Sequence, residues 1–427
     1  MTNVIQILKK RGLIEAMTSE ELCDLAENPL KVYCGFDPTS DSLHLGNMVA
    51  IMGLAWFQRL GHTPIALIGG ATGMIGDPSG KAKERRLLDE KTLRKNAEGI
   101  KKDLETVLDF DHPTSKAMMI DNLDWLGEFS FIHFLREVGS CFRVGTMLAK
   151  ESVRLRLNSE EGISFTEFSY QLLQAYDFLY LNEKFGVNVQ IGGSDQWGNI
   201  TAGIDLVRRV RGEQAYGVTF PLLMTSDGKK FGKSEEGAIW LSSEKCSHYQ
   251  FYQHLFRVTD ADVIRLMRML TFMDMEEIHE YERKMLQPDY VPNTAQKRLA
   301  EEVTRIVRGE EGLQTALRVT STAKPGSDTA LDAETLESIA ADMPSCTLKA
   351  QEVVNEKVVN LLVYTKLQSS RGQARRLIIN GGVYLNNEKM ADENRVISQE
   401  DLIDGRMLLL GVGRKNKKLI RLSKENE

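Results

Sequence analysis

The feature that most constrains the fold is an alternation of apolar runs and a helical pattern near the start of the chain. Residues Lys31–Phe36 form an apolar run that ends in the turn signal Asp37-Pro38. Apolar residues then recur at helical spacing from Asn47 to Leu60, and Pro64–Ile68 is a second apolar run. A strand, a helix and a strand in this order form a βαβ unit, whose strands lie parallel in one sheet. We therefore expect an α/β fold.

Later segments continue this alternation. Strand patterns occupy Lys116–Ile120, Val187–Ile191 and Val218–Met224, and helical patterns occupy Phe165–Leu181 and Trp197–Arg211. An open parallel sheet of this kind binds its ligand at the carboxyl ends of its strands. Beyond Ser234 amphipathic helical patterns dominate to about Arg318, and the polar stretch Thr320–Thr329 is the expected linker.

Composition and charge exclude several classes of protein. No window reaches the ~18 apolar residues of a membrane helix, and Lys9, Lys10, Arg11 and Glu15 break the pattern of a signal or transit peptide. Five cysteines without a C-x-x-C pair argue against disulfides and zinc. We expect a cytoplasmic protein with no membrane partner.

Charge is unevenly distributed along the chain. The chain carries a net charge of −6, yet Asn355–Glu427 holds 14 Lys/Arg and 9 Asp/Glu, a net charge of +5. A basic segment on an acidic body suggests a polyanionic partner. The alternative is a solvated, lysine-rich terminus.

The first motif follows the first predicted strand. Phe36-Asp37-Pro38-Thr39 precedes His44-Leu45-Gly46-Asn47, and Thr39, Ser40, Asp41 and Ser42 are residue types that cap helices. A helix N-terminus after a strand offers N–H groups to an anion. His44 can donate to a phosphate, and Gly46 leaves room for a base. In isolation, these residues also fit a capped surface helix.

The second motif is Lys230-Phe231-Gly232-Lys233-Ser234, after the turn Ser226-Asp227-Gly228. A lysine is a mobile point charge that can follow a phosphate. In this order the two motifs resemble the HIGH and KMSKS signatures of the class I aminoacyl-tRNA synthetases. Four segments resemble the tyrosyl branch of that class: Tyr33–Thr39, Gly69–Lys81, Tyr170–Asp177 and Gln190–Asn199.

The residues of one helix support this resemblance. Tyr170, Gln174 and Asp177 stand at i, i+4 and i+7, on one helical face, among apolar residues. Polar groups that face a buried pocket need partners, and a bound tyrosine offers a phenol and an ammonium group. The alternative is a helix whose polar stripe faces water.

The resemblance implies a role for each site residue. Tyr33 and Asp177 would hold the substrate hydroxyl, and Asp77, Tyr170 and Gln174 its ammonium group. The residues implied for ATP are Cys34, Gly35, Asp37, Thr39, His44, Asn47, Gly192, Gly193, Asp195, Gln196, Lys230, Lys233 and Ser234. Among them Cys34 and Asp195 would hold the ribose and Gln196 would lie near the α-phosphate, while Lys81 and Arg85 would contact pyrophosphate. Thr39, His44, Asn47, Lys81, Arg85, Lys230 and Lys233 would act in catalysis.

Other nucleotide motifs do not fit. A P-loop ending at Gly80-Lys81 needs glycine at position 75 and Ser or Thr at 82, where the chain has Ile75 and Ala82.

Asn47 replaces the second histidine of the HIGH signature. This replacement keeps an N–H donor and loses the imidazole. The family's reaction makes tyrosyl-adenylate from L-tyrosine and ATP and then charges tRNA(Tyr). We expect Mg²⁺ to accompany ATP and no metal site held by the protein.

The C-terminal segment Ser369–Asn386 resembles a small RNA-binding fold first known from a ribosomal protein. Its expected RNA contacts are Arg371, Arg375, Arg376, Arg414, Lys415, Lys417 and Lys418. The alternative for this module is a protein-binding role.

The resemblance also implies how the chain is divided. The expected parts are a Rossmann-like catalytic domain at 1–222 with an insertion around 111–160, a helical domain with the KMSKS loop at 223–319, a linker at 320–350 and a small α+β RNA-binding domain at 355–421. The family is dimeric, and Asp111–Lys150 is the expected interface. Two other functions stay open, namely a tryptophanyl enzyme of the same class and a non-catalytic RNA-binding relative.

Overall fold

The computed structural model describes residues 3–79, 88–234, 237–322, 331, 333–340, 343–413 and 416–423. The chain forms two compact units, Met1–Ser242 with Thr259–Ala295, and Ser243–Val258 with Gln296–Glu427. The expected domain boundaries stay a prediction. In the described part of the chain, no helix has both the length and the apolar character to cross a membrane.

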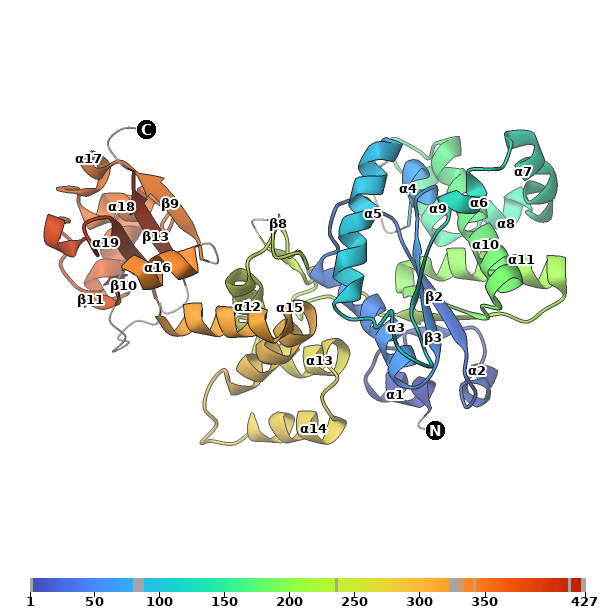
Figure 1. The fold of residues 1–427 in the computed structure, drawn as a ribbon, viewed down its shortest axis with the longest axis horizontal. Coiled ribbons are helices and arrows are strands. Elements are labelled where there is room, and N and C mark those ends of the chain that lie inside the picture. The colour runs from blue at the N-terminus through green and yellow to red at the C-terminus, as the bar shows by residue number, and fades with distance from the viewer. Residues whose placement is uncertain are drawn as a thin grey trace. The chain divides into compact units, whose positions relative to one another are not determined.

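The first unit is built on a six-stranded sheet with the order β1-β6-β5-β2-β3-β4. Its neighbouring strands β2 and β3 are labelled in Figure 1. Its strands are β1 Ala16–Met17, β2 Lys31–Phe36, β3 Thr63–Ile68, β4 Met118–Asp121, β5 Val189–Gly193 and β6 Tyr216–Phe220. Strands β2 to β6 are parallel, and β1 pairs antiparallel with β6. The expected α/β fold with a parallel sheet is confirmed.

The helices of this unit include those that connect the strands of the sheet, and α13 and α14 follow its last strand. They are α1 Val4–Lys10, α2 Glu21–Leu25, α3 Met48–Arg59, α4 Thr72–Ile75, α5 Glu90–Glu105, α6 Leu123–Leu126, α7 Phe131–Glu137, α8 Val144–Leu148, α9 Glu151–Leu157, α10 Phe165–Phe185, α11 Trp197–Arg211, α13 Asp260–Leu270 and α14 Met275–Lys284. Short 3₁₀ turns lie at η1 Leu45–Asn47, η2 Gly139–Cys141 and η3 Ser194–Gln196, and β7 Lys233–Ser234 pairs with β8 Gly237–Ala238.

The strand order places a ligand site between β2 and β5. From β2 the chain moves to β3 and β4 on one side, whereas β5 and β6 lie on the other side of β2. The connections therefore diverge at the β2–β5 pair, which is where open α/β sheets form a crevice at their carboxyl ends. Tyr33 of β2 packs with Phe178 of α10 and Leu206 of α11 in one core cluster. Because strand side chains alternate between faces, Cys34 points to the opposite face of the sheet.

Most predicted elements are present with small shifts at their ends. The predicted strand Val218–Met224 ends earlier, at Phe220, because Pro221 has no N–H group to continue the ladder. Helix α10 runs beyond its predicted end to Phe185 and stops at Gly186, whose φ of 67° suits glycine. The predicted helix caps at Thr39–Ser42 are wrong. The turn η1 begins after His44, and the Ser42 hydroxyl instead contacts Asp103.

The second unit combines helices with a five-stranded sheet of order β11-β10-β12-β13-β9. Its helices are α12 His248–Phe256, α15 Thr294–Thr322, α16 Ala333–Ala340, α17 Ala350–Val353, α18 Val358–Tyr364 and α19 Arg371–Ile379, with the turn η4 Gln399–Asp401. Its strands are β9 Ser345–Leu348, β10 Val383–Leu385, β11 Glu388–Met390, β12 Met407–Val412 and β13 Asn416–Leu422. Helix α15 includes Thr320–Thr322 of the predicted linker, and positions 323–329 lie outside the described residues.

Candidate active site

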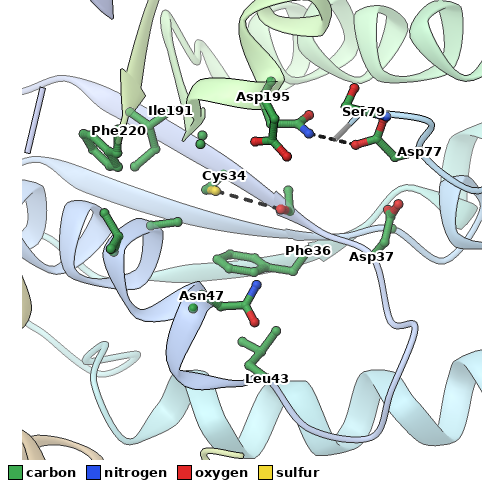
Figure 2. Close-up of a pocket in the computed structure, with 18 of the residues that line it drawn as sticks. Cys34, Phe36, Asp37, Leu43, Asn47, Asp77, Ser79, Ile191, Asp195 and Phe220 are labelled. Carbon is green, nitrogen blue, oxygen red and sulfur yellow. Dashed lines mark hydrogen bonds between the residues drawn. The ribbon is translucent and has the colours of Figure 1, made fainter. Parts of the chain in front are cut away.

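A cavity of about 410 Å³ opens at the carboxyl ends of β2 and β5 (Figure 2). Of the predicted site residues, it is lined by Tyr33, Cys34, Gly35, Asp37, Thr39, His44, Asn47, Asp77, Tyr170, Gln174, Asp177, Gly192, Gly193, Asp195, Gln196 and Lys230. Lys81 and Arg85 lie outside the described residues, as do the side chains of Lys233 and Ser234. Segments far apart in sequence therefore meet in one pocket.

The buried end of the cavity holds Asp177 and Tyr33. Asp177 is 2% exposed, and its carboxylate accepts hydrogen bonds from Nδ2 of Asn122 and from Nε1 of Trp125, both at 2.9 Å. Burial raises the pKa of Asp177 to about 8, although both hydrogen bonds act to lower it. This end of the pocket is buried, and the two hydrogen bonds fix the orientation of the Asp177 side chain.

Tyr33 lies beside this carboxylate with its hydroxyl unsatisfied. The side chain is fully buried, and the hydroxyl has no hydrogen-bond partner in the part of the chain that the structure describes. Burial, and then the charge of Asp177, raise the pKa of Tyr33 well above its ordinary value, so the group stays a neutral phenol. A buried hydroxyl without a partner is costly, and a ligand with a polar group at this end would satisfy it.

Next to this end lies a network of carboxylates and amides. Tyr170 donates its hydroxyl to Oδ2 of Asp37 at 2.9 Å, and Nε2 of Gln196 donates to Oδ2 of Asp77 at 2.7 Å. Gln174 accepts from Nδ2 of Asn199 at 2.9 Å. Gln196, expected near the α-phosphate, thus lies beside Asp77. The network thus places two carboxylates, Asp37 and Asp77, at the wall of the cavity.

The opposite side of the cavity suits a nucleotide. Cys34 and Asp195 lie close to each other (Figure 2), and burial together with the charge of Asp195 raises the pKa of the Cys34 thiol to about 12. Cys34 therefore remains a thiol near neutral pH and is not activated as a nucleophile. A side chain at Gly193 would place its Cβ 2.6 Å from Oδ1 of Asp195. A larger residue at this position would displace the Asp195 carboxylate.

The two signature segments are joined by backbone hydrogen bonds. Leu45 N–H donates to the carbonyl of Ile239, whose own N–H donates to the carbonyl of Gly232, both at 2.8 Å. Gly232 has a φ of 83°, and a Cβ there would lie 3.0 Å from the nitrogen of Gly46. The His44 N–H donates to Oδ1 of Asn47 at 3.0 Å. The Lys230 loop thus rests on the His44 turn.

Sequence reasoning missed Asn122 and Trp125. Asn122 directly follows β4 and is fully buried, with one amide proton bound to Asp177 and a second contact to Oγ1 of Thr72. Its position at the carboxyl end of a parallel strand is a signal that could have identified it. Trp125, three residues later, has no comparable sequence signal. Gln190, which also lines the cavity with a buried Oε1 atom, was missed as well.

Comparison with known proteins identifies the family of this site. Residues 25–323 match the family "tRNA synthetases class I (W and Y)", and residues 335–420 match the "Tyrosine--tRNA ligase SYY-like C-terminal domain". The tyrosine–tRNA ligase of Protochlamydia amoebophila is 64% identical over 425 residues, covering 100% of both chains. The chain belongs to the tyrosyl-tRNA synthetases. Enzymes of this family activate tyrosine with ATP and charge tRNA with it, and this is the reaction of the chain.

Further relatives of this synthetase agree. The chloroplastic/mitochondrial tyrosine–tRNA ligase of Arabidopsis thaliana is 53% identical and covers 99% of this chain and 84% of its own length. The structure of a C-terminally truncated mitochondrial tyrosyl-tRNA synthetase from Coccidioides posadasii is 31% identical, with a TM-score of 0.65 over 74% of this chain and 91% of its own. The tryptophanyl and non-catalytic alternatives are therefore set aside.

The predicted RNA contacts occupy different environments in the second unit. Arg371, Arg375 and Arg376 are exposed on α19. Lys418 is half-buried on β13, and Arg414 and Lys415 lie outside the described residues. Lys417 is only 7% exposed, which corrects the expected surface position. It shares a face of β13 with the core residue Leu419, because side chains two apart on a strand point the same way.

Proposed function

We propose that the buried end of the cavity binds the phenol of L-tyrosine between Tyr33 and Asp177. The unpartnered Tyr33 hydroxyl beside an Asp177 carboxylate is the observation that carries this assignment. Asn122 and Trp125 orient the Asp177 side chain through their hydrogen bonds. In this orientation Asp177 accepts a hydrogen bond from the phenol O–H of the substrate. Phenylalanine would leave both polar groups buried without a partner, which disfavours its binding.

The substrate ammonium group binds at the carboxylate and amide network. Asp77, Tyr170 and Gln174 supply oxygen acceptors there, and Asp37 adds a second negative charge. This placement points the tyrosine carboxylate toward Gln196 and the open half of the cavity. The amino acid is thus held at both ends with its reacting group directed at the nucleotide.

ATP binds along the opposite half of the cavity. Cys34 and Asp195 contact the ribose, Gly192 and Gly193 allow the nucleotide to approach the backbone, and Thr39, His44 and Asn47 contact phosphates. The tyrosine carboxylate then attacks the α-phosphorus in line and pyrophosphate leaves. Substrate groups make and break the bonds, so the protein contributes orientation and stabilises developing charge. The unactivated Cys34 thiol agrees with a reaction that needs no protein nucleophile.

Lysines stabilise the leaving pyrophosphate. Lys230 lines the cavity, and its loop rests on the His44 turn. Lys233, Lys81 and Arg85 are assigned here by resemblance. Mg²⁺ enters with ATP, whose phosphates are ligands that this ion prefers. In the second step the terminal adenosine hydroxyl of tRNA(Tyr) attacks the adenylate. Arg371, Arg375 and Arg376 contact the bound tRNA.

The chain forms a homodimer through Asp111–Lys150 and the residues that follow it, as far as the start of α10. Large apolar side chains are exposed there, at Phe131, Ile132, Val144, Leu155 and Phe165, each more than 60% exposed. Exposed apolar groups gathered in one segment are typical of an interface. Sedimentation at micromolar concentration should give a dimer, and Ile132→Glu should give a monomer. A monomeric parent chain would contradict this. Residence in the cytoplasm stays a prediction, because one relative is organellar.

Tyrosine-dependent ATP–pyrophosphate exchange tests the assignment of the site. His44→Ala should lower the exchange rate by roughly 10²- to 10³-fold, the usual effect of removing one preorganised donor, and should leave tyrosine affinity within about twofold. His279→Ala on α14, away from the cavity lining, is the matched control and should keep the full rate. An unchanged rate in His44→Ala would refute the phosphate role of this turn.

A further inference from the structure

Helix α5 presents a buried polar face to the turn that follows β2. Asn96, Gly99 and Asp103 are spaced at i, i+3 and i+7, so they share one side of the helix. Asn96 and Asp103 are 7% and 5% exposed, whereas Lys101 and Lys102 on the same helix are exposed. Buried polar side chains on an otherwise solvated helix indicate specific partners.

This face makes hydrogen bonds to one turn, residues 38–43. Nδ2 of Asn96 donates to the Pro38 carbonyl at 2.8 Å. Oδ2 of Asp103 accepts the Leu43 N–H at 2.7 Å and the Ser42 hydroxyl at 2.8 Å. The helix therefore holds the turn at both of its ends.

Gly99 allows the helix to approach the middle of the turn. A Cβ at this position would lie 1.9 Å from the carbonyl oxygen of Asp41, a contact that forces the backbone to move. Glycine in a helix interior lowers helix propensity relative to alanine. The close approach gives a physical reason for its presence here.

The turn needs this support because it has no regular structure of its own. No helix or strand is assigned between Phe36 and Leu45, yet Thr39, Ser40, Ser42 and His44 line the cavity. Leu43, at the foot of the pocket in Figure 2, is held from both sides, since its carbonyl also accepts the Leu241 N–H at 2.8 Å. The position of the turn is thus set by contacts from outside it.

The same anchor extends to residues 239–242, the segment that contacts the lysine loop. Oγ of Ser42 accepts the Ser242 N–H at 3.1 Å as well as bonding Asp103. Three residues before Ser242, the Ile239 N–H donates to the carbonyl of Gly232. A chain of hydrogen bonds therefore runs from α5 through the His44 turn to the segment that follows Lys230.

We propose that Asp103, together with Asn96 and Gly99, is a positioning set for ATP in the adenylation step. None of the three lines the cavity; they act by holding the turn that carries Thr39 and His44. This inference rests on the proposed phosphate role of that turn. On this proposal the position of ATP depends on α5, whereas the position of tyrosine depends on α10 and β4.

Two variants test the inference by different physical routes. Asp103→Ala removes the oxygen that accepts both the Leu43 N–H and the Ser42 hydroxyl. Gly99→Ala pushes on Asp41 while it improves helix propensity. Each should lower kcat/KM for ATP in pyrophosphate exchange by about 10- to 100-fold, because a shift of the order of 1 Å has such an effect on reacting groups. Tyrosine affinity by equilibrium dialysis should change by less than about twofold.

The control variants separate this inference from the proposed function. Glu105→Ala makes the matching truncation of a carboxylate side chain at an exposed position of α5 and should leave all parameters unchanged. If His44→Ala slows exchange while both α5 variants behave as the parent chain, the positioning role is wrong and the phosphate role of the turn survives. If His44→Ala also leaves the exchange rate unchanged, the phosphate role of the turn and the positioning role of α5 are both wrong. An equal loss of tyrosine and ATP binding in the α5 variants would show a general structural role and overturn the inference.

Discussion

The unpartnered hydroxyl of Tyr33 leads to a prediction in which stability and affinity change in opposite directions. Tyr33→Phe removes one oxygen and keeps the ring, which packs edge-to-face on Phe178 at a centroid distance of 5.2 Å. In the ligand-free protein this oxygen is buried without a hydrogen-bond partner among the described residues. Its removal therefore deletes an unfavourable burial and no hydrogen bond.

The size of each effect follows from the chemistry of this hydroxyl. An unsatisfied buried polar group costs about 1–3 kcal/mol, so the free energy of unfolding of the ligand-free variant should equal or exceed that of the parent chain by up to about 2 kcal/mol. A neutral hydrogen bond to the substrate contributes about 0.5–1.5 kcal/mol. The Kd for tyrosine should therefore rise by about 2- to 13-fold.

Urea denaturation without ligand and equilibrium dialysis with tyrosine measure the two quantities. Tyr290→Phe is a matched control, because the Tyr290 hydroxyl accepts the Ala295 N–H at 2.9 Å outside the cavity lining. That control should lose about 1 kcal/mol of stability and keep the parent affinity. A Tyr33→Phe variant that is less stable than the parent chain and binds tyrosine equally well would refute the reasoning.

Two further predictions concern buried charges. Burial raises the pKa of Asp177 from 3.8 to about 8. Because the unfolded chain ionises this group at lower pH, the free energy of unfolding falls as pH rises from 3.8 to about 8, by at most about 6 kcal/mol. Asp177→Asn should therefore gain stability relative to the parent chain between pH 5 and pH 8 in urea denaturation, and a constant difference would contradict this. Burial lowers the pKa of Lys417 from 10.5 to about 8, so below pH 8 its charge destabilises the fold and stability rises between pH 8 and 10.5. Lys417→Met should stabilise the second unit by up to about 3 kcal/mol at pH 7. It should leave the Kd for tRNA unchanged in filter binding. Weaker tRNA binding by this variant would instead support the predicted RNA contact of Lys417.

The sequence alone determined the local elements and most of the cavity lining. Strand β2 and helices α3 and α11 are recognisable from the period of their apolar residues, because that period follows from backbone geometry within one segment. The polar stripe of Tyr170, Gln174 and Asp177 faces the cavity as helical spacing predicts. The resemblance of the signature segments then identified the reaction.

The tertiary structure alone decided how distant polar groups meet. Asn122 and Asp177 are 55 positions apart and Asp103 and Leu43 are 60 apart, so no local pattern pairs them. Lys417 looked like one more basic surface residue, and it is buried because the pairing of β13 with β12 puts it opposite Gly411. Such contacts depend on the topology and register of strands, which arise from packing between segments far apart in sequence.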